Sequence, residues 1–593
     1  MKESSVGLLK ILGPSLAGSS TLCFSYLLVQ FLLATILSAC GSSSLNEPTG
    51  AASESTSGSE HLTAAEVQTI IAQAATQAQS LGLPVTIAVL DHEGTVLGVL
   101  QMASARTMTT INGGGSGGLE GRSIPADFAA ISKAGTPAFF STQGNAFTTR
   151  SASFIIQEHF PPQVSPSPGG PLFGVQLSQL RCSDVSRTGH PASTSNLPVG
   201  LSGDPGGLPL YKNGTAVGGI GVEGDGIYTI DRDGSDSDQS IEEIIAAAGT
   251  LGFSAPAGIR GNTILVDGVA IPFANAEPPA TLNAIPFATF IANGGTAIVP
   301  PIDSPATGFV ASSLGGVSGS IDPNFPIIQG TDGGLTVAEV TQILTQAAVR
   351  AETTRAAIRN PIGTPARVSI TVVDTNGVIL GIFRTTDAPL FGFDVSAQKA
   401  RTANFFTQAQ AGTEVRAAAG IDLNNNAVPL LGYADVLASE GIALNGSIAF
   451  SDRASGFMSQ PIYPPGATSS PTVGPLSKSP GIWSVFNTGL QSDALRFPTN
   501  VLTGTPPCAL VGSGPLGRVP NGFQTFPGSV SLFKGGVHVG AIGISGDGVD
   551  QDDFIAAAGS AGFEAPAGIR ADTIFVRGAR LPYVVFPRNP TLN

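Results

Sequence analysis

Apolar residues along this chain follow first a helical and then a strand period. After Thr63 and Glu66 they recur at intervals of three and four, which predicts an amphipathic helix that begins with a capping box. From Val85 to Gly98 two β-branched runs flank a turn, which predicts a β-hairpin. A second helix is predicted around the block Lys133–Phe140.

The second half of this pattern follows a long stretch rich in Pro and Gly. A hairpin is predicted to turn at Asn213-Gly214, followed by an acidic loop, an Ala-rich helix from Ile241 to Leu251 and a short strand near Thr263 to Val266. Two hairpins with few parallel crossovers predict a mostly antiparallel sheet with helices packed against it. The fold class expected from the sequence is therefore α+β.

The whole succession occurs twice, in five matching blocks that keep one order. The pairs are Leu62–Val67 with Leu335–Val340, Val85–Gly98 with Val368–Gly381, Lys133–Phe140 with Lys399–Phe406, Gly218–Gly226 with Gly540–Gly548, and Gly252–Arg260 with Gly562–Arg570. The offsets between blocks change, which indicates loop insertions within each copy, from about Ser141 to Asp204 and from Thr407 to Phe526. In the second occurrence the Ala-rich helix is predicted from Asp553 to Ala561, after the acidic loop. We therefore predict two tandem α+β domains with long insertions.

The N-terminus has the features of an export signal. Lys2 and Lys10 precede a hydrophobic run, and Leu37-Ser-Ala-Cys40 resembles a bacterial lipobox, whose Cys40 would carry lipid. An ordinary signal peptide or a short anchor with an incidental Cys is the alternative. The predicted divisions are signal peptide 1–40, flexible tether 41–60, copy 1 at 61–275, linker 276–332 and copy 2 at 333–593.

Composition limits the classes of partner. The chain has 28 Lys and Arg against 42 Asp and Glu, a formal charge of −14, so we expect no nucleic-acid partner. The 76 Gly and 44 Pro indicate a loop-rich protein, while the apolar share of 42% is enough for a core. Cys182 and Cys508 remain after the signal region, and in an oxidising compartment they would either form a disulfide or stay as two buried thiols. Their similar placement before Lys212 and Lys534 favours the disulfide.

The repeated blocks resemble the GlcG/HbpS family of haem-binding or haem-degrading domains, whose fold is similar to profilin. The resemblance rests on the opening helix, the hairpin Val368–Gly381, the Lys-Ala-x-Thr block, and Gly206–Leu210 with Val217–Gly221. In copy 2 the last two features correspond to Pro527–Val530 and Val539–Gly543. The resemblance implies two profilin-like domains with haem as the ligand. Since no Cys-x-x-Cys-His occurs, any haem would be bound non-covalently.

The Lys-Ala-x-Thr helices offer candidate ligand-binding groups in both copies. A lysine could pair with a propionate, a threonine could donate a hydrogen bond, and phenylalanines offer flat apolar surface. The candidates are Lys133, Thr136, Phe139 and Phe140, Lys399, Thr402, Phe405 and Phe406, with His159 as an axial ligand. The alternative is a helix whose phenylalanines are core residues and whose lysine is solvated.

The two acidic loops are candidate sites for Ca²⁺, because alternating Asp and Gly lets hard oxygen ligands converge. The candidates are Asp225, Asp231, Asp233, Asp236, Asp238, Asp547, Asp550, Asp552 and Asp553. Their spacing is not that of an EF-hand, and the alternative is a solvated turn that caps the following helix.

The leading hypothesis is a lipid-anchored envelope protein, expected at the outer membrane facing the periplasm or the cell surface, that binds haem or a similar planar anionic small molecule. A second hypothesis is an envelope scaffold that uses a ligand-free version of the fold, with protein partners or a homo-oligomer. The third is an enzyme that degrades haem or acts on a small hydroxy acid. No nucleophile with a base is visible in the sequence, which makes catalysis the weakest of the three.

Overall fold

The computed structural model describes residues 60–180, 183–185, 197–234, 236–421, 427–466, 472–496, 508–509 and 514–592. They belong to one unit that runs from Ser59 to Asn593. The predicted signal peptide and its Cys40 lie outside the described residues. No helix among those described is both long and apolar enough to span a bilayer.

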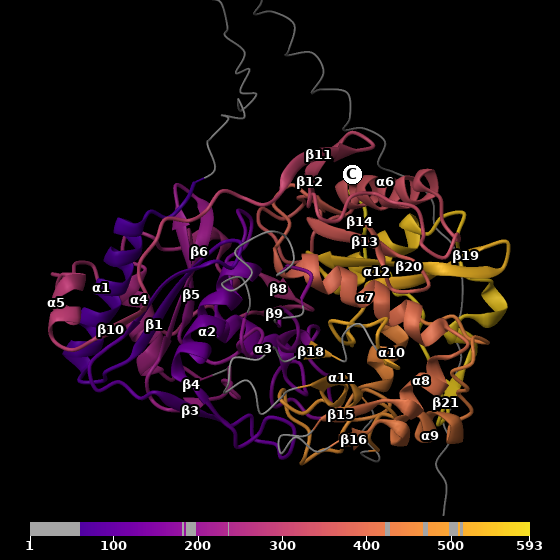
Figure 1. Cartoon of the computed structure of the whole chain (residues 1–593), viewed down its shortest axis with the longest axis horizontal. Coiled ribbons are helices and arrows are strands. Elements are labelled where there is room, and N and C mark those ends of the chain that lie inside the picture. The colour runs from indigo at the N-terminus through magenta and orange to yellow at the C-terminus, as the bar shows by residue number, and fades with distance from the viewer. Residues whose placement is uncertain are drawn as a thin grey trace, which may run out of the picture. The chain divides into compact units, whose positions relative to one another are not determined.

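Copy 1 is built on a five-stranded sheet in the order β10-β2-β1-β6-β5, and all neighbouring strands are antiparallel (Figure 1). Both predicted hairpins are present, β1 with β2 and β5 with β6, and the second turns at Asn213-Gly214, where both φ angles are positive. The strands are β1 (Thr86–Asp91), β2 (Val96–Gln101), β5 (Gly207–Lys212), β6 (Thr215–Glu223) and β10 (Thr296–Val299).

Copy 2 repeats this topology in a six-stranded antiparallel sheet of order β11-β12-β14-β13-β20-β19. Its central strands β14-β13-β20-β19 occupy the places of β2-β1-β6-β5. The strands are β11 (Val310–Leu314), β12 (Val317–Ile321), β13 (Val368–Val373), β14 (Ile379–Thr385), β19 (Ser529–Lys534) and β20 (Val537–Gly546). The predicted α+β class, with mostly antiparallel sheets flanked by helices, is confirmed.

Helices cover both faces of each sheet, because successive side chains of a strand point to opposite faces. In β1, Ile87 and Val89 pack with α1 (Ala64–Leu81) and α4 (Ile241–Gly249), whereas Ala88 and Leu90 pack with α2 (Ala126–Phe140). Copy 2 has α6 (Val337–Thr353) and α12 (Val549–Gly559) on one side and α7 (Phe391–Thr407) on the other. The predicted capping boxes are present, with Thr63 and Thr336 as N-caps.

The inner helices α2 and α7 share one hydrophobic core. Phe140 of α2 stacks on Phe391 of α7 with ring centroids 4.5 Å apart, and every residue of α7 is buried. The segment 276–332, expected to link the copies, contains α5 (Phe287–Ala292) and adds β10 to the first sheet and β11 and β12 to the second. The two copies are therefore joined by packing as well as by the chain.

Short elements also lie outside the repeated blocks. In copy 1 these are β3 (Met108–Ile111), β4 (Ser123–Pro125), β7 (Ile227–Tyr228) and α3 (Thr149–Ile156). In copy 2 they are α8 (Ala411–Ala417), β15 (Ala419–Ile421), β16 (Ala427–Pro429), α9 (Leu431–Ser439), α10 (Asp452–Met458), α11 (Leu490–Ala494), β17 (Leu495–Arg496) and β18 (Cys508–Ala509). Each copy also ends in a small hairpin, β8 (Leu265–Val266) with β9 (Val269–Ala270), and β21 (Phe575–Val576) with β22 (Ala579–Arg580).

One predicted boundary was wrong. The acidic residues of copy 2 were expected in a loop before a helix that begins at Asp553, but α12 begins at Val549 and includes Asp550 and Asp552 in its first turn. Carboxylates are favourable there because the unpaired N–H groups of a helix start carry partial positive charge. In copy 1 the corresponding loop stays irregular until α4 begins at Ile241.

Candidate functional site

The Lys-Ala-x-Thr helix of copy 1 holds its lysine in a closed carboxylate cage. Lys133 Nζ lies 2.6 Å from Glu242 Oε2 on α4 and 2.7 Å from Asp204 Oδ2, just before β5. Glu223 Oε2, at the end of β6, is 3.0 Å from the same nitrogen. Lys133 is 0% exposed. We name Lys133, Asp204, Glu223 and Glu242 the lysine cage; it ties α2 to the sheet and to α4.

The lysine cage carries an excess of negative charge, since three carboxylates surround one ammonium group. Burial raises the pKa of Asp204 well above its usual range although Lys133 opposes the shift. Burial likewise raises the pKa of Glu242 to about 8, with Lys133 opposing and Glu223 adding to the change. For Lys133, burial favours a lower pKa, but the three carboxylates outweigh it and raise the pKa well above its usual value. The ammonium therefore stays charged, while Asp204 and Glu242 keep their protons to a higher pH than exposed carboxyl groups do.

Copy 2 repeats the arrangement with fewer acids. Lys399 Nζ, also 0% exposed, lies 2.9 Å from Asp552 Oδ2 on α12 and donates to the carbonyl of Ile544 at 2.8 Å. The ammonium also lies 4.7 Å from the ring centroid of Phe526. Burial raises the pKa of Asp552 to about 7, against the attraction of Lys399. The shared lysine thus connects the inner helix to the helix on the other face of the sheet, α2 to α4 in copy 1 and α7 to α12 in copy 2.

The shared threonines hold backbone groups of the chain itself. Thr136 Oγ1 accepts from the Ser202 N–H at 2.6 Å and donates to the Ser202 carbonyl at 3.0 Å. Thr402 Oγ1 accepts from the Gln524 N–H at 3.0 Å. Ser202 and Gln524 both lie just before the strand that opens the second hairpin. Each threonine therefore attaches the end of an insertion to the inner helix.

The four candidate phenylalanines lie in the core. Phe139 and Phe405 are 0% exposed, and Phe140 and Phe406 are 2% exposed. Phe405 and Phe406 both contact Phe523, which belongs to the copy 2 insertion. The phenylalanines are core residues, as the alternative interpretation expected. The lysines are buried and not solvated, which that interpretation did not expect. Ligand binding by this block stays a prediction, one that requires a ligand to displace protein groups.

The acidic residues expected to bind Ca²⁺ are mostly paired with arginines. In copy 1, Arg150 of α3 lies 2.6 Å from Asp231 and 2.8 Å from Asp238, and it also binds Glu243 at 2.9 Å. In the same loop Asp225 accepts from the Ile227 N–H, Asp236 accepts from the Asp238 N–H, and the Asp233 N–H donates to Asp231.

Copy 2 has the same type of pairing. Arg453 of α10 pairs with Asp550 and Asp553, and Arg359 lies 2.6 Å from Asp547. Within the described ranges, the three carboxylates close enough together to hold a metal are Asp204, Glu223 and Glu242. None of the three belongs to the predicted Ca²⁺ set. The cation that they contact is the Lys133 ammonium. Calcium binding by the acidic loops therefore stays a prediction without a preformed ligand set.

Sequence reasoning missed Arg150 and Arg453, although a signal was present. Both follow a capping residue, Thr148 or Ser451, at the start of a short helix in the insertion. One acidic partner of each arginine, Glu243 or Asp553, directly follows the acidic partner of the lysine on the same helix, α4 or α12. Asp204 and Glu223 have no acidic counterpart in copy 2, where Phe526 and Ser545 stand at the matching places. Comparison of charges between the copies would have indicated the arginines but not the full cage.

The histidines and cysteines contribute little to a described site. His159 is buried, and its Nδ1 lies 2.8 Å from the carbonyl of Ser167. Burial lowers the pKa of His92 and lowers that of His538 to about 4, so both are neutral at physiological pH. His190 and Cys182 lie outside the described residues, and Cys508 lies in β18. The disulfide between the cysteines stays a prediction.

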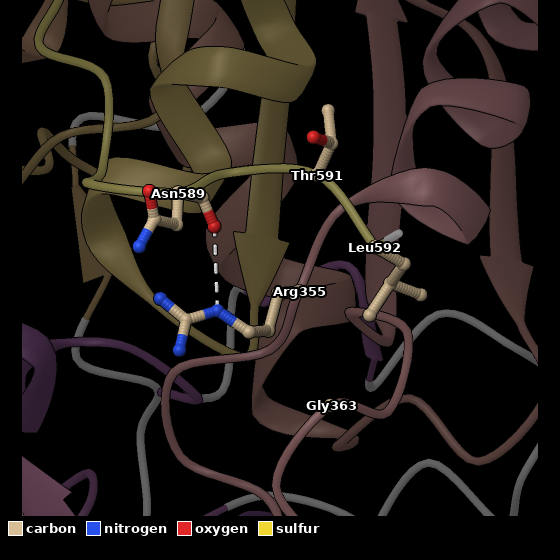
Figure 2. A pocket seen from close by; sticks show the side chains of 5 residues that line it. All are labelled: Arg355, Gly363, Asn589, Thr591 and Leu592. Carbon is tan, nitrogen blue, oxygen red and sulfur yellow. Dashed lines mark hydrogen bonds between the residues drawn. The ribbon is translucent and has the colours of Figure 1, made fainter. Parts of the chain in front are cut away.

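A surface pocket of about 690 Å³ lies between the α6–β13 connection and the C-terminal segment (Figure 2). It is lined by Arg355, Gly363, Asn589, Thr591 and Leu592. None of these residues was a candidate from the sequence. Figure 2 shows the Arg355 guanidinium beneath the Asn589 backbone, to which it donates.

Comparisons with protein-family models and with curated proteins give no match. Similar solved structures include PduOC in complex with haem, at 19% identity and TM-score 0.19, covering 39% of this chain and 97% of the other. Klebsiella pneumoniae protein ORFY has 18% identity and TM-score 0.20, covering 33% and 93%. A double mutant of Streptomyces reticuli HbpS has 18% identity and TM-score 0.19, covering 35% and 96%. At these identities and TM-scores the three structures assign this chain neither a family nor an activity.

Proposed function

We propose that this chain is a binding protein of two tandem GlcG/HbpS-like copies that holds haem or a similar planar anionic small molecule non-covalently. The observation that carries the proposal is the repetition of the family-like blocks on two sheets of one topology. The lipobox-like sequence at Cys40 supports an envelope protein attached through lipid. The proposal includes no catalytic step, since no nucleophile is paired with a base in the motifs of the sequence.

The lysine cage limits where such a ligand would lie. A propionate could reach Lys133 only if Asp204, Glu223 and Glu242 moved away from the ammonium, which would leave buried carboxylates without their cation. The same holds for Lys399 and Asp552. A ligand that uses the Lys-Ala-x-Thr block must therefore displace these carboxylates from the lysines.

A titration of haem into the chain without residues 1–40 tests the proposal through the Soret band. We expect a saturable shift at micromolar haem with one or two equivalents bound. The unfolded chain in urea serves as the control for non-specific association. An absorption spectrum that grows without saturation, identical for folded and unfolded chain, rejects haem as the ligand.

A second candidate function is an envelope scaffold, and the covering of α2 and α7 supports it. The copy 1 insertion reaches across to α7, where Asp184 lies 2.7 Å from Arg401 Nη1, and the copy 2 insertion contacts α7 through Phe523. A fold whose helix face is filled by its own insertions is suited to a structural role. Here we expect no Soret shift, and cross-linking of intact cells followed by quantitative mass spectrometry should give one partner in fixed ratio to this chain.

A further inference from the structure

The pocket of Figure 2 belongs to copy 2 because the connection that forms one wall is longer there. In copy 1, α1 ends at Leu81 and β1 begins at Thr86, whereas in copy 2 α6 ends at Thr353 and β13 begins at Val368. Two backbone bonds fasten this connection to the C-terminal segment, from the Arg355 N–H to the Pro590 carbonyl at 2.8 Å and from the Leu592 N–H to the Thr353 carbonyl at 2.9 Å. The walls of the pocket are therefore held together before any ligand arrives.

Arg355 presents an oriented guanidinium to this pocket. Its Nε donates to the Asn589 carbonyl at 3.3 Å and its Nη2 to the Arg588 carbonyl at 3.0 Å, as Figure 2 illustrates for the first. These acceptors are neutral, and no carboxylate of the described residues lies within 4.0 Å of the guanidinium. Arg150, Arg359 and Arg453, by contrast, each bind two or more carboxylates. The positive charge of Arg355 is thus fixed in place, and no ion pair among the described residues neutralises it.

The remaining lining completes a site for an anion with an apolar body. Asn589 and Thr591 supply neutral hydrogen-bonding groups, Gly363 has φ +94° and brings no side chain, and Leu592 supplies an apolar surface. None of the five lining residues is acidic, although the chain carries a net charge of −14. A guanidinium recognises a carboxylate through paired N–H donors.

We propose that this pocket binds a small organic monocarboxylate, with the carboxylate on the free edge of the Arg355 guanidinium and the apolar body against Leu592. The lining contains no His, Met, Tyr or Cys that could ligate a haem iron, so the site is separate from the haem binding proposed above. Its volume of about 690 Å³ is within the usual range for small-ligand pockets, roughly 300 to 1,000 Å³.

Ligand-observed ¹⁹F NMR with 4-fluorobenzoate and the full chain without residues 1–40 tests this site. We expect the fluorine signal to broaden with the protein and the signal of neutral 4-fluorobenzyl alcohol to stay sharp. Arg355→Gln should abolish the broadening, and Arg355→Lys should weaken it, because a point charge replaces the paired donors. Arg580→Gln, which removes an exposed arginine on β22, is the matched control and should keep it.

A second variant separates loss of the site from loss of the fold. Leu592→Glu places a carboxylate within the lining and should abolish the broadening by repulsion, with a melting temperature close to that of the parent chain. Equal broadening in the parent, Arg355→Gln and Leu592→Glu would overturn the proposal, as would no broadening in the parent. Because the probe contains neither iron nor porphyrin, this test and the haem titration succeed or fail independently.

Discussion

Lys133 shows how much can depend on a single buried side chain. Its ammonium lies within 3.0 Å of the buried carboxylates of Asp204, Glu223 and Glu242. Burying an ion is tolerated only where an opposite charge and hydrogen bonds replace the lost water. Removal of the lysine therefore affects three groups at once.

We predict that Lys133→Met destabilises the protein by about 3–5 kcal/mol at pH 7.5, because it leaves buried carboxylates without a cation. The loss should shrink at pH 5, where these acids accept protons more readily. Urea unfolding followed by the fluorescence of Trp483, the single tryptophan, measures both values. Lys534→Met, which removes a half-exposed lysine paired with Glu339, should cost less than about 1 kcal/mol. Equal losses in the two variants would contradict the role given to the cage.

The lysine cage also predicts the direction of the pH dependence. The pKa of Glu242 is raised from 4.5 to about 8, so its contribution to stability is fully present below pH 4.5 and is lost as the pH rises towards 8. Each retained proton costs about 1.4 kcal/mol of stability per pH unit across this window. Asp552, with its pKa raised to about 7, acts in the same direction. Thermal unfolding between pH 5 and 8.5 should therefore show a falling melting temperature.

Glu223→Gln tests whether the cage is the source of this fall. The variant removes one of the negative charges that raise the pKa of Glu242, so its melting temperature should fall less steeply than that of the parent chain and should be higher at pH 8. Glu66 and Glu339 have lowered pKa values, and their contributions are lost only below pH 4.5, outside this window. Parallel pH profiles for parent and variant would refute the explanation.

At the scale of elements, the Gly-rich loop between β3 and β4 is explained by close packing. The Leu119 N–H donates to the Phe486 carbonyl at 3.1 Å, and the Ser116 N–H donates to the Ile482 carbonyl at 3.3 Å. Gly118 has φ +56°, and a Cβ there would lie 2.3 Å from the Phe486 carbonyl oxygen. This loop of copy 1 therefore packs directly on the insertion of copy 2.

We predict that Gly118→Ala lowers stability more than Gly121→Ala. Both positions have positive φ, which costs a non-Gly residue roughly 1–2 kcal/mol, but a Cβ at Gly121 meets nothing within 4 Å. The difference between the variants isolates the clash with Phe486. Thermal unfolding together with Trp483 emission measures it, since Trp483 lies in the contacted segment. Indistinguishable variants would mean that the loop does not pack on the insertion.

The helix boundaries show what local sequence can and cannot indicate. The capping boxes at Thr63 and Thr336 gave the correct starts of α1 and α6, because both partners of a capping box lie within one turn. The predicted start of α12 was wrong, because the local sequence around Asp550 and Asp552 is compatible with a loop as well as with a helix. The pairing of Asp550 with Arg453, which lies on a helix distant in sequence, is not visible locally. Local rules identified the elements, and remote partners set their ends.

At the scale of the whole molecule, the two copies depend on one another. Phe391 and Phe393 of α7 belong to the same hydrophobic core as Phe139 and Phe140 of α2. Asp184 of copy 1 is buried against Arg401 of copy 2, and Asn521 donates to Asp184 at 2.6 Å. A polar network and an apolar core therefore cross between the copies.

We predict that copy 2 alone, residues 333–593, does not reproduce the stability of the whole chain. Without copy 1 it exposes the apolar face of α7 and leaves Arg401 without Asp184, so it should bind the dye ANS and unfold at a lower temperature. The chain without residues 1–40 should unfold in one calorimetric transition. Two separate transitions, or an isolated copy 2 as stable as the whole chain, would show that the copies are independent domains.

The sequence by itself determined the duplication, the α+β class, the hairpins and the starts of the first helices, because each depends on residues close together in the chain. The tertiary structure alone decided which groups the lysines of the Lys-Ala-x-Thr block contact. Lys133 in the sequence is compatible with a solvated or a ligand-binding lysine, and only the folded chain brings Asp204, Glu223 and Glu242 to its ammonium. The physical reason is that burial and charge pairing depend on distances between residues remote in sequence, which local periodicity does not encode.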